Sequence, residues 1–192
     1  SGTITDEQAE SLGGYDYGLE LNGLTSITDK QAVSLSKVKR GLELDGLTSI
    51  TDEQAASLSK VKILHLNGLT SITNEQAESL IIGDQYGDGL ELNGLTSITN
   101  VQAESLGKIH KLWLNGLTSI NDEQAESLGN SDYVLELNGL TSINDEQAKG
   151  LANLTFNLQL NGLTSLTDEQ VEILSNYRAR RVLGLDGLTS IT

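Results

Sequence analysis

The sequence predicts an α/β solenoid, in which about eight units of one strand, one turn and one short helix stack along a single axis. The segment at residues 64–72, Leu-His-Leu-Asn-Gly-Leu-Thr-Ser-Ile, recurs eight times with few changes. Self-similarity at a period of roughly 20 to 50 residues is typical of solenoid proteins. Successive copies lie 22 to 26 residues apart, as the positions of their Asn or Asp show: Asn22, Asp45, Asn67, Asn93, Asn115, Asn138, Asn161 and Asp186.

The first half of each unit is predicted to be a strand followed by a turn. Apolar residues alternate in the segment Leu64–Leu66, which suits a short strand with one buried face. Gly68 follows directly after Asn67, and we expect this glycine to permit a turn of the backbone. The next apolar residues, Leu69 and Ile72, are predicted to point back into the interior.

The second half of each unit is predicted to be a helix of about two turns. Thr73 and Gln76 have the spacing of a capping box, and acidic residues occupy the first turn, where the helix dipole favours them. Ala77 and Leu80 form the inward stripe. Such a short helix does not persist alone, so packing between units must hold it. The same capping pair occurs in every unit: Thr5/Gln8, Thr28/Gln31, Thr51/Gln54, Thr73/Gln76, Thr99/Gln102, Asn121/Gln124, Asn144/Gln147 and Thr167/Gln170.

Differences in unit length are confined to the segment between helix and strand. Thirteen residues separate Asn22 from Leu35, the same spacing recurs in later units, and the variation follows that Leu. Insertions in solenoids collect in loops along one edge, and the longest here is 81–89. We expect the tyrosines of this edge to bury their rings beneath the loops, with a second contact surface as the alternative. They are Tyr15, Tyr17, Tyr86, Tyr133 and Tyr177.

Charge and composition restrict the classes of partner. The net charge of −15 disfavours nucleic acid, which requires a basic surface. Solubility is the simpler interpretation of this charge, and attraction for cationic partners is the alternative. The chain contains no Cys, which removes disulfides, thiolate metal sites and thiol nucleophiles from consideration. No apolar run approaches the roughly 18 to 20 residues of a membrane span, and no signal peptide is visible. The compartment stays open, with an extracellular or cell-envelope location favoured over the others.

The units resemble the leucine-rich repeat. Leu19 and Leu21, with Leu24 and Ile27 behind them, match the central block of that family. The run Asn-Gly-Leu-Thr-Ser-Ile-Thr-Asp-Glu-Gln-Ala is similar to the cysteine-containing subtype, with short repeats of bacterial type. The resemblance spans the whole chain. It implies a curved parallel sheet on the concave side, short helices on the convex side, and a concave face that binds other macromolecules.

One departure from the family pattern concerns the inside of the turn. The family places an inward Asn or Cys there, whose ladder satisfies backbone groups. We expect hydroxyls such as those of Thr25 and Ser26, or buried water, to replace that ladder. The position is occupied here by Leu24, Leu47, Leu69, Leu95, Leu117, Leu140, Leu163 and Leu188.

The candidate binding residues lie between the two leucines of each strand. These residues are predicted to face the concave side in a row, with neighbouring strands about 4.8 Å apart. An acidic row could be a solvated face; the functional interpretation is a binding surface with Trp113, the only Trp of the chain, as its anchor. The row comprises Glu20, Glu43, His65, Glu91, Trp113, Glu136 and Gln159, and ends at Gly184.

No catalytic residue, metal ligand or cofactor is predicted. His65 and His110 lie on different parts of the unit, and His65 has only Glu43 and Glu91 beside it. The Asn-or-Asp column, one step beyond the row, is interpreted as a structural amide ladder in which stacked side chains bond one another. Acidic pairs such as Asp52 and Glu53 lack the spacing of a calcium loop.

Residues 1–192 are predicted to form one solenoid that functions as a non-catalytic protein-binding scaffold. The alternative is a passive spacer or adhesive repeat region of a larger surface protein. Ser1 and Gly2 are interpreted as a cloning scar, and the chain as part of a longer array without dedicated capping units. Open ends of this kind are expected to allow end-to-end self-association.

Overall fold

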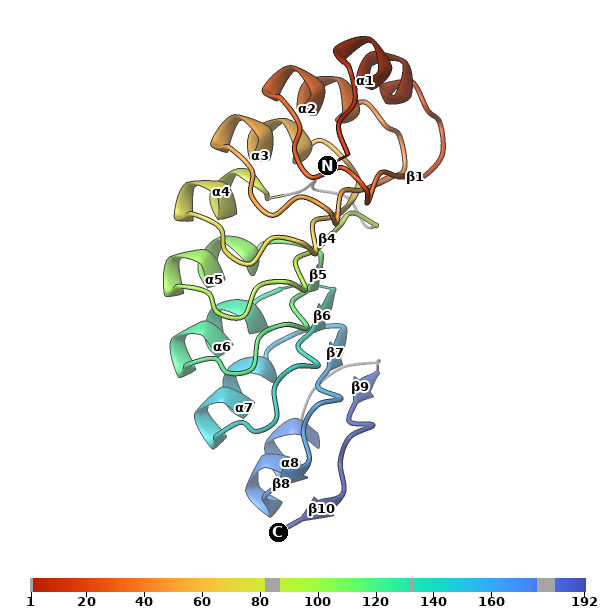
Figure 1. Cartoon of the computed structure of the whole chain (residues 1–192). Coiled ribbons are helices and arrows are strands. Elements are labelled where there is room, and N and C mark those ends of the chain that lie inside the picture. Colours follow the sequence, from red (N-terminus) through yellow and green to blue (C-terminus); the bar gives the residue numbers. More distant parts are fainter. Residues whose placement is uncertain (1, 82–86, 132, 176–181) are drawn as a thin grey trace.

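The computed structural model describes residues 2–81, 87–131, 133–175 and 182–192 and has the predicted architecture. Units of strand, turn and helix stack into an arc, with the strands on the inner, concave side and the helices on the outer, convex side (Figure 1). The N-terminal helix and the C-terminal strand lie at opposite ends of the arc (Figure 1). The predicted α/β solenoid with a parallel sheet is therefore confirmed.

Each described helix has six to eight residues. The helices are α1 Asp6–Gly13, α2 Asp29–Leu35, α3 Asp52–Leu58, α4 Asn74–Ser79, α5 Asn100–Leu106, α6 Asp122–Gly129, α7 Asp145–Leu151 and α8 Asp168–Ser175. The strands of the concave sheet are β1 Leu19–Glu20, β2 Gly41–Glu43, β3 Ile63–His65, β4 Gly89–Glu91, β5 Lys111–Trp113, β6 Val134–Glu136, β7 Asn157–Gln159 and β9 Leu183–Gly184. A second, two-stranded sheet pairs β8 Ser165–Leu166 with β10 Ser190–Ile191.

One continuous apolar interior runs between the sheet and the helices. Most units supply two strand leucines, a turn leucine and a helix alanine, and α8 has Val171 at the position of the alanine. In the third unit Leu64, Leu66, Leu69 and Ala77 are all fully buried. These residues repeat in register from unit to unit, because every pair of neighbouring concave strands is parallel and aligned Leu to Leu. The interior therefore exists only when units lie against one another, as expected of a repeat array.

The capping glutamines connect the units. In α5 the Gln102 Oε1 accepts a hydrogen bond from the N–H of Thr99 at 2.8 Å, which completes the predicted capping box. The Gln102 Nε2 donates to the carbonyl of Ile72 in the preceding unit, also at 2.8 Å. The same inter-unit bond joins seven successive pairs, from Gln31 with Ile4 to Gln170 with Ile143. We call this series the Gln ladder.

Backbone groups of the turns have partners within the protein, and in the last turn a hydroxyl of the expected kind takes part, since Thr189 Oγ1 donates to the carbonyl of Thr164 at 2.9 Å. Neither Thr25 nor Ser26 provides the replacement for the missing family ladder. Instead, the N–H of Leu24 donates to the carbonyl of Leu21 at 2.9 Å, and equivalent bonds close the later turns. Together with the Gln ladder, these bonds supply partners within the protein, so the inward leucines can be fully buried.

In every described turn after the first, the glycine is required for close packing rather than for its backbone conformation. Among the described residues only Gly87 has a positive φ, so Gly68 does not use the left-handed region. A Cβ at Gly68 would lie 2.2 Å from the carbonyl oxygen of Asp45 and 2.5 Å from that of Leu47. Stacked turns therefore approach one another more closely than any side chain would allow.

The tyrosines of the loop edge are only partly described. Tyr15 and Tyr17 are 49% and 63% exposed and meet edge to face at 6.0 Å, so the prediction that their rings are buried is wrong. Both belong to the segment that leads into β1, and from the next loop Arg40 lies over the Tyr17 ring at 5.7 Å without burying it. Tyr133 is half-buried against Phe156, with ring centroids 4.4 Å apart. Tyr86, with most of the 81–89 insertion, and Tyr177 lie outside the described residues.

Candidate functional site

The concave row is assembled by the register of the parallel sheet. Glu20 pairs with Glu43, Glu43 with His65, and His65 with Glu91. The series continues through Trp113, Glu136, Gln159 and Gly184. All the residues predicted to form the row therefore lie side by side on adjacent strands.

The amides beside the row hold its carboxylates in place. Asn22 donates through Nδ2 to Glu43 Oε2 at 3.0 Å, and Asn67 donates in the same way to Glu91 at 3.1 Å. Glu136 accepts one bond from each of two flanking amides. Hydrogen bonds to charged acceptors are stronger than neutral ones. The carboxylates of Glu43, Glu91 and Glu136 are therefore oriented by the neighbouring column, through contacts that were not predicted from the sequence.

The Asn-or-Asp column forms a ladder, although not of the predicted kind. Each side-chain oxygen accepts a hydrogen bond from the backbone N–H of the next column residue, as Asn67 does from Asn93 at 2.9 Å. The prediction of bonds between stacked amide side chains is wrong, because the oxygens accept from the backbone of the next turn while amide nitrogens such as that of Asn67 donate to glutamates of the row. The bond recurs at every step from Asn22 to Asp186. We call this series the Asn ladder.

Trp113 lies over a glycine on the neighbouring strand. A Cβ at Gly89 would come within 2.6 Å of Trp113 Cζ3 and 3.1 Å of Trp113 Cη2, so the six-membered ring occupies the space that a side chain at 89 would fill. Trp113 is consequently half-buried. Gly89 was not among the predicted site residues, although a glycine inside a strand indicates close approach of another group.

A hollow of about 280 Å³ lies over the first three strands of the concave face. Its floor includes Gly18 and Gly41, which leave space where other units carry side chains. Acidic residues of the row, Glu20 and Glu43, line it together with His65. The side-chain exposures of Glu43 and His65 are 31% and 22%, so these groups are accessible without standing free of the surface.

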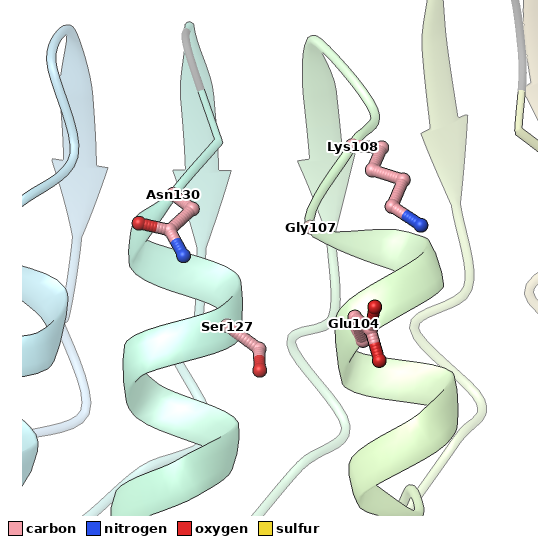
Figure 2. Close-up of a pocket in the computed structure, with 5 residues that line it drawn as sticks. All are labelled: Glu104, Gly107, Lys108, Ser127 and Asn130. Carbon is pink, nitrogen blue, oxygen red and sulfur yellow. The ribbon is translucent and has the colours of Figure 1, made fainter.

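The convex side also has hollows, but these recur between successive helices. One of about 470 Å³ lies between α5 and α6; Figure 2 shows Glu104 and Lys108 on the α5 side, and Ser127 and Asn130 on the side of the next unit. A similar hollow of about 450 Å³ lies between α6 and α7. Gly107 allows the close approach of the units that carry α5 and α6, since a Cβ there would lie 2.2 Å from the Ser127 carbonyl oxygen. These hollows therefore reflect helix spacing rather than an individual site.

The described part of the chain contains no helix that is long and apolar enough to cross a membrane.

The geometry defines a repeat solenoid of the leucine-rich-repeat type. No protein-family model matches the chain, and no curated protein matches it. Among solved structures, the chain is similar to TLR13 in the crystal structure of the TLR13–ssRNA13 complex, with a TM-score of 0.67 and 18% sequence identity. The similarity covers 100% of this chain and 28% of that chain, so this chain spans little more than a quarter of the length of its structural relative. At this identity the likeness concerns the fold.

Proposed function

We propose that this protein is a non-catalytic binding scaffold whose concave row holds a protein partner that carries Lys or Arg side chains. The observation that supports it most is the row itself, in which carboxylates fixed by the Asn ladder flank a half-buried Trp113. Side chains held in place before binding lose little freedom on association, which favours affinity. We further propose that the units are of the cysteine-containing type, with Leu at the inward position.

Trp113 is proposed as the anchor of this surface. Tryptophan is enriched among residues that contribute most to protein–protein binding. One part of its ring is supported by Gly89, and the side chain still reaches the surface at the centre of the row. Glu91 and Glu136 lie on the two adjacent strands, so a cation beside an apolar or aromatic group fits this position.

RNA is the less favoured ligand. TLR13 is found with ssRNA13 in its crystal structure. In this chain the concave side of the sheet carries Glu20, Glu43, Glu91 and Glu136, and the net charge is −15. Phosphate groups would be repelled by such a surface.

The alternative function is that of a passive spacer. It is supported by the near-identity of the units. It is also supported by the Gln ladder and the Asn ladder, which recur at every described step and connect each unit of the arc to the next. A spacer needs no accessible anchor, so the two functions differ in what they predict for Trp113.

Selection from a library of random displayed peptides distinguishes the two. Immobilised protein is expected to enrich peptides that contain Lys or Arg, and their binding is expected to weaken with added salt. The substitution Trp113→Ala should abolish binding of the enriched peptides. Tyr17→Ala, which removes an exposed aromatic at the loop edge, is the matched control and should leave binding unchanged. Absence of enrichment would favour the spacer, whereas equal binding by the Trp113→Ala protein would show that the peptides bind away from Trp113.

We also propose that two copies of the chain can stack end to end. The α1 face presents Gln8 beside Ile4 and Leu12, around an open hollow of about 470 Å³. Gln8 holds the position from which later glutamines donate to the preceding unit. Ile191, 55% exposed at the opposite end, occupies the position of the accepting Ile. A contact between these two unlike faces is heterologous and extends rather than closes.

A further inference from the structure

The Asn ladder changes its chemistry at one interior position. Where the next unit has a glutamate in the row, the column residue is an amide that donates to it, as Asn67 does to Glu91 at 3.1 Å. Asp45 is the one acidic residue of the column between Asn22 and Asn161. The row residue of the next unit, which lies opposite the second oxygen of Asp45, is His65, the one histidine in the row.

Three ligand atoms converge at this position. One carboxylate oxygen of Glu43, one of Asp45 and one imidazole nitrogen of His65 all lie within 4.8 Å of one another. The His65 Nδ1 is 3.7 Å from Glu43 Oε1, which is longer than a hydrogen bond. No hydrogen bond or ion pair joins Asp45 to His65 in the described part of the chain. The three groups therefore face a common point without satisfying one another.

The separations suit a small divalent cation. Two ligands with bonds of about 2.0 to 2.1 Å in tetrahedral geometry lie about 3.3 to 3.4 Å apart. The distance from His65 Nδ1 to Glu43 Oε1 is close to this value, and rotation of the partly exposed Asp45 side chain can bring the third atom in. A cation would also neutralise the repulsion between the two carboxylates.

Each of the three groups is oriented by a contact on its far side. The other oxygen of Glu43 accepts from Asn22 Nδ2 at 3.0 Å, and Asp45 Oδ1 accepts from the N–H of Asn67 at 2.9 Å. The His65 Nε2 lies 3.5 Å from Glu91 Oε1, while Nδ1 lies 3.7 Å from Glu43 Oε1. A carboxylate behind the second ring nitrogen is the usual support for a metal-binding histidine.

We propose that Glu43, Asp45 and His65 form a site for a divalent transition-metal ion, with Zn²⁺ as the representative. One imidazole and two carboxylates suit such ions better than Ca²⁺ or Mg²⁺, which prefer oxygen ligands alone. The three side chains leave a coordination position open on the concave surface, as in zinc sites that bind water or another ligand. No metal site is expected from the sequence because the two histidines, His65 and His110, lie apart and cannot bind one ion together. In the structure Asp45, rather than His110, is the further ligand beside His65 and Glu43. The site does not require a protein partner.

Zinc titration of the full chain tests the proposal. The protein is treated with EDTA, dialysed and titrated with ZnCl₂ by isothermal calorimetry, and the two imidazoles of the chain are followed by NMR. We expect a single saturable Zn²⁺ per chain and a shift of the His65 signals without one of the His110 signals. Glu91→Gln should keep the stoichiometry and weaken binding about 10- to 100-fold, because it only supports His65.

Asp45→Asn is the decisive variant, and it is designed to fold. It restores the residue found at most other positions of the column and keeps the oxygen that accepts from Asn67. It should abolish the saturable site. Asp186→Asn makes the same change in the same column without a histidine opposite and should bind Zn²⁺ like the unaltered protein. Unchanged binding by Asp45→Asn, equal loss by Asp186→Asn, unshifted His65 signals, or no saturable binding at all would overturn the proposal.

Discussion

Removal of one bond of the Gln ladder should cost far more in the interior of the array than at its end. Gln102 is 6% exposed and makes two side-chain bonds of 2.8 Å, one to Thr99 within its unit and one to Ile72 in the preceding unit. A net contribution of about 0.5 to 1.5 kcal/mol per bond gives about 1 to 3 kcal/mol for Gln102→Ala. The substitution leaves the Ile72 carbonyl and the Thr99 N–H without a hydrogen-bond partner. The expected loss of stability therefore lies in the upper part of that range.

The matched control is Gln8→Ala. Gln8 accepts from Thr5 in the same capping box, but it is exposed and its Nε2 donates to no carbonyl among the described residues, so about 0.5 to 1 kcal/mol is expected. The gain in helix propensity on changing Gln to Ala is the same in both variants and cancels. Gln102→Glu distinguishes the contribution of the capping bond from that of the inter-unit bond at a single position. It keeps the oxygen that accepts from Thr99 but replaces the donor to the Ile72 carbonyl with a second oxygen.

Guanidinium denaturation, followed by circular dichroism and by the fluorescence of Trp113, measures these differences. We expect Gln102→Glu at neutral pH to be at least as destabilising as Gln102→Ala, and both to exceed Gln8→Ala by about 1 kcal/mol or more. Equal losses for Gln102→Ala and Gln8→Ala, or a neutral Gln102→Glu, would refute the assignment of inter-unit stability to the ladder.

The same reasoning gives three further expectations. Gly94→Ala should destabilise the protein by about 1 to 3 kcal/mol in denaturation, because its Cβ would lie 2.2 Å from a backbone carbonyl oxygen, whereas Gly23→Ala, with nothing within 4 Å, should be nearly neutral. Gly89→Ala should displace the Trp113 ring and shift its emission to longer wavelength; an unchanged spectrum would contradict the packing described. Sedimentation velocity should show association that rises with concentration and falls in Gln8→Ala, and a strict monomer would exclude end-to-end stacking.

The sequence was sufficient for those features that lie within one unit. Alternation in Leu64–Leu66 places the strand, and the Thr73/Gln76 pair places the start of the helix; both are confirmed in the structure. The eightfold recurrence then requires parallel strands in register, since identical units can bury their leucines only against one another.

What the sequence could not supply are contacts between units. The second function of Gln102 joins residues 30 positions apart, and nothing within one unit indicates that the amide extends beyond its own cap. The turn glycines were interpreted through backbone freedom, whereas Gly68 is needed for the approach of a neighbouring carbonyl. Asp45 looked like a variant of a structural column until the structure placed it near His65. In each case the missing information was the distance between neighbouring units.

Acrylamide quenching of the single tryptophan tests the proposed binding surface most directly. A Lys- or Arg-containing peptide from the selection should protect Trp113 from the quencher and shift its emission to shorter wavelength as the row becomes covered. Peptide binding that leaves both the quenching and the emission of Trp113 unchanged would show that the partner is held elsewhere on the molecule.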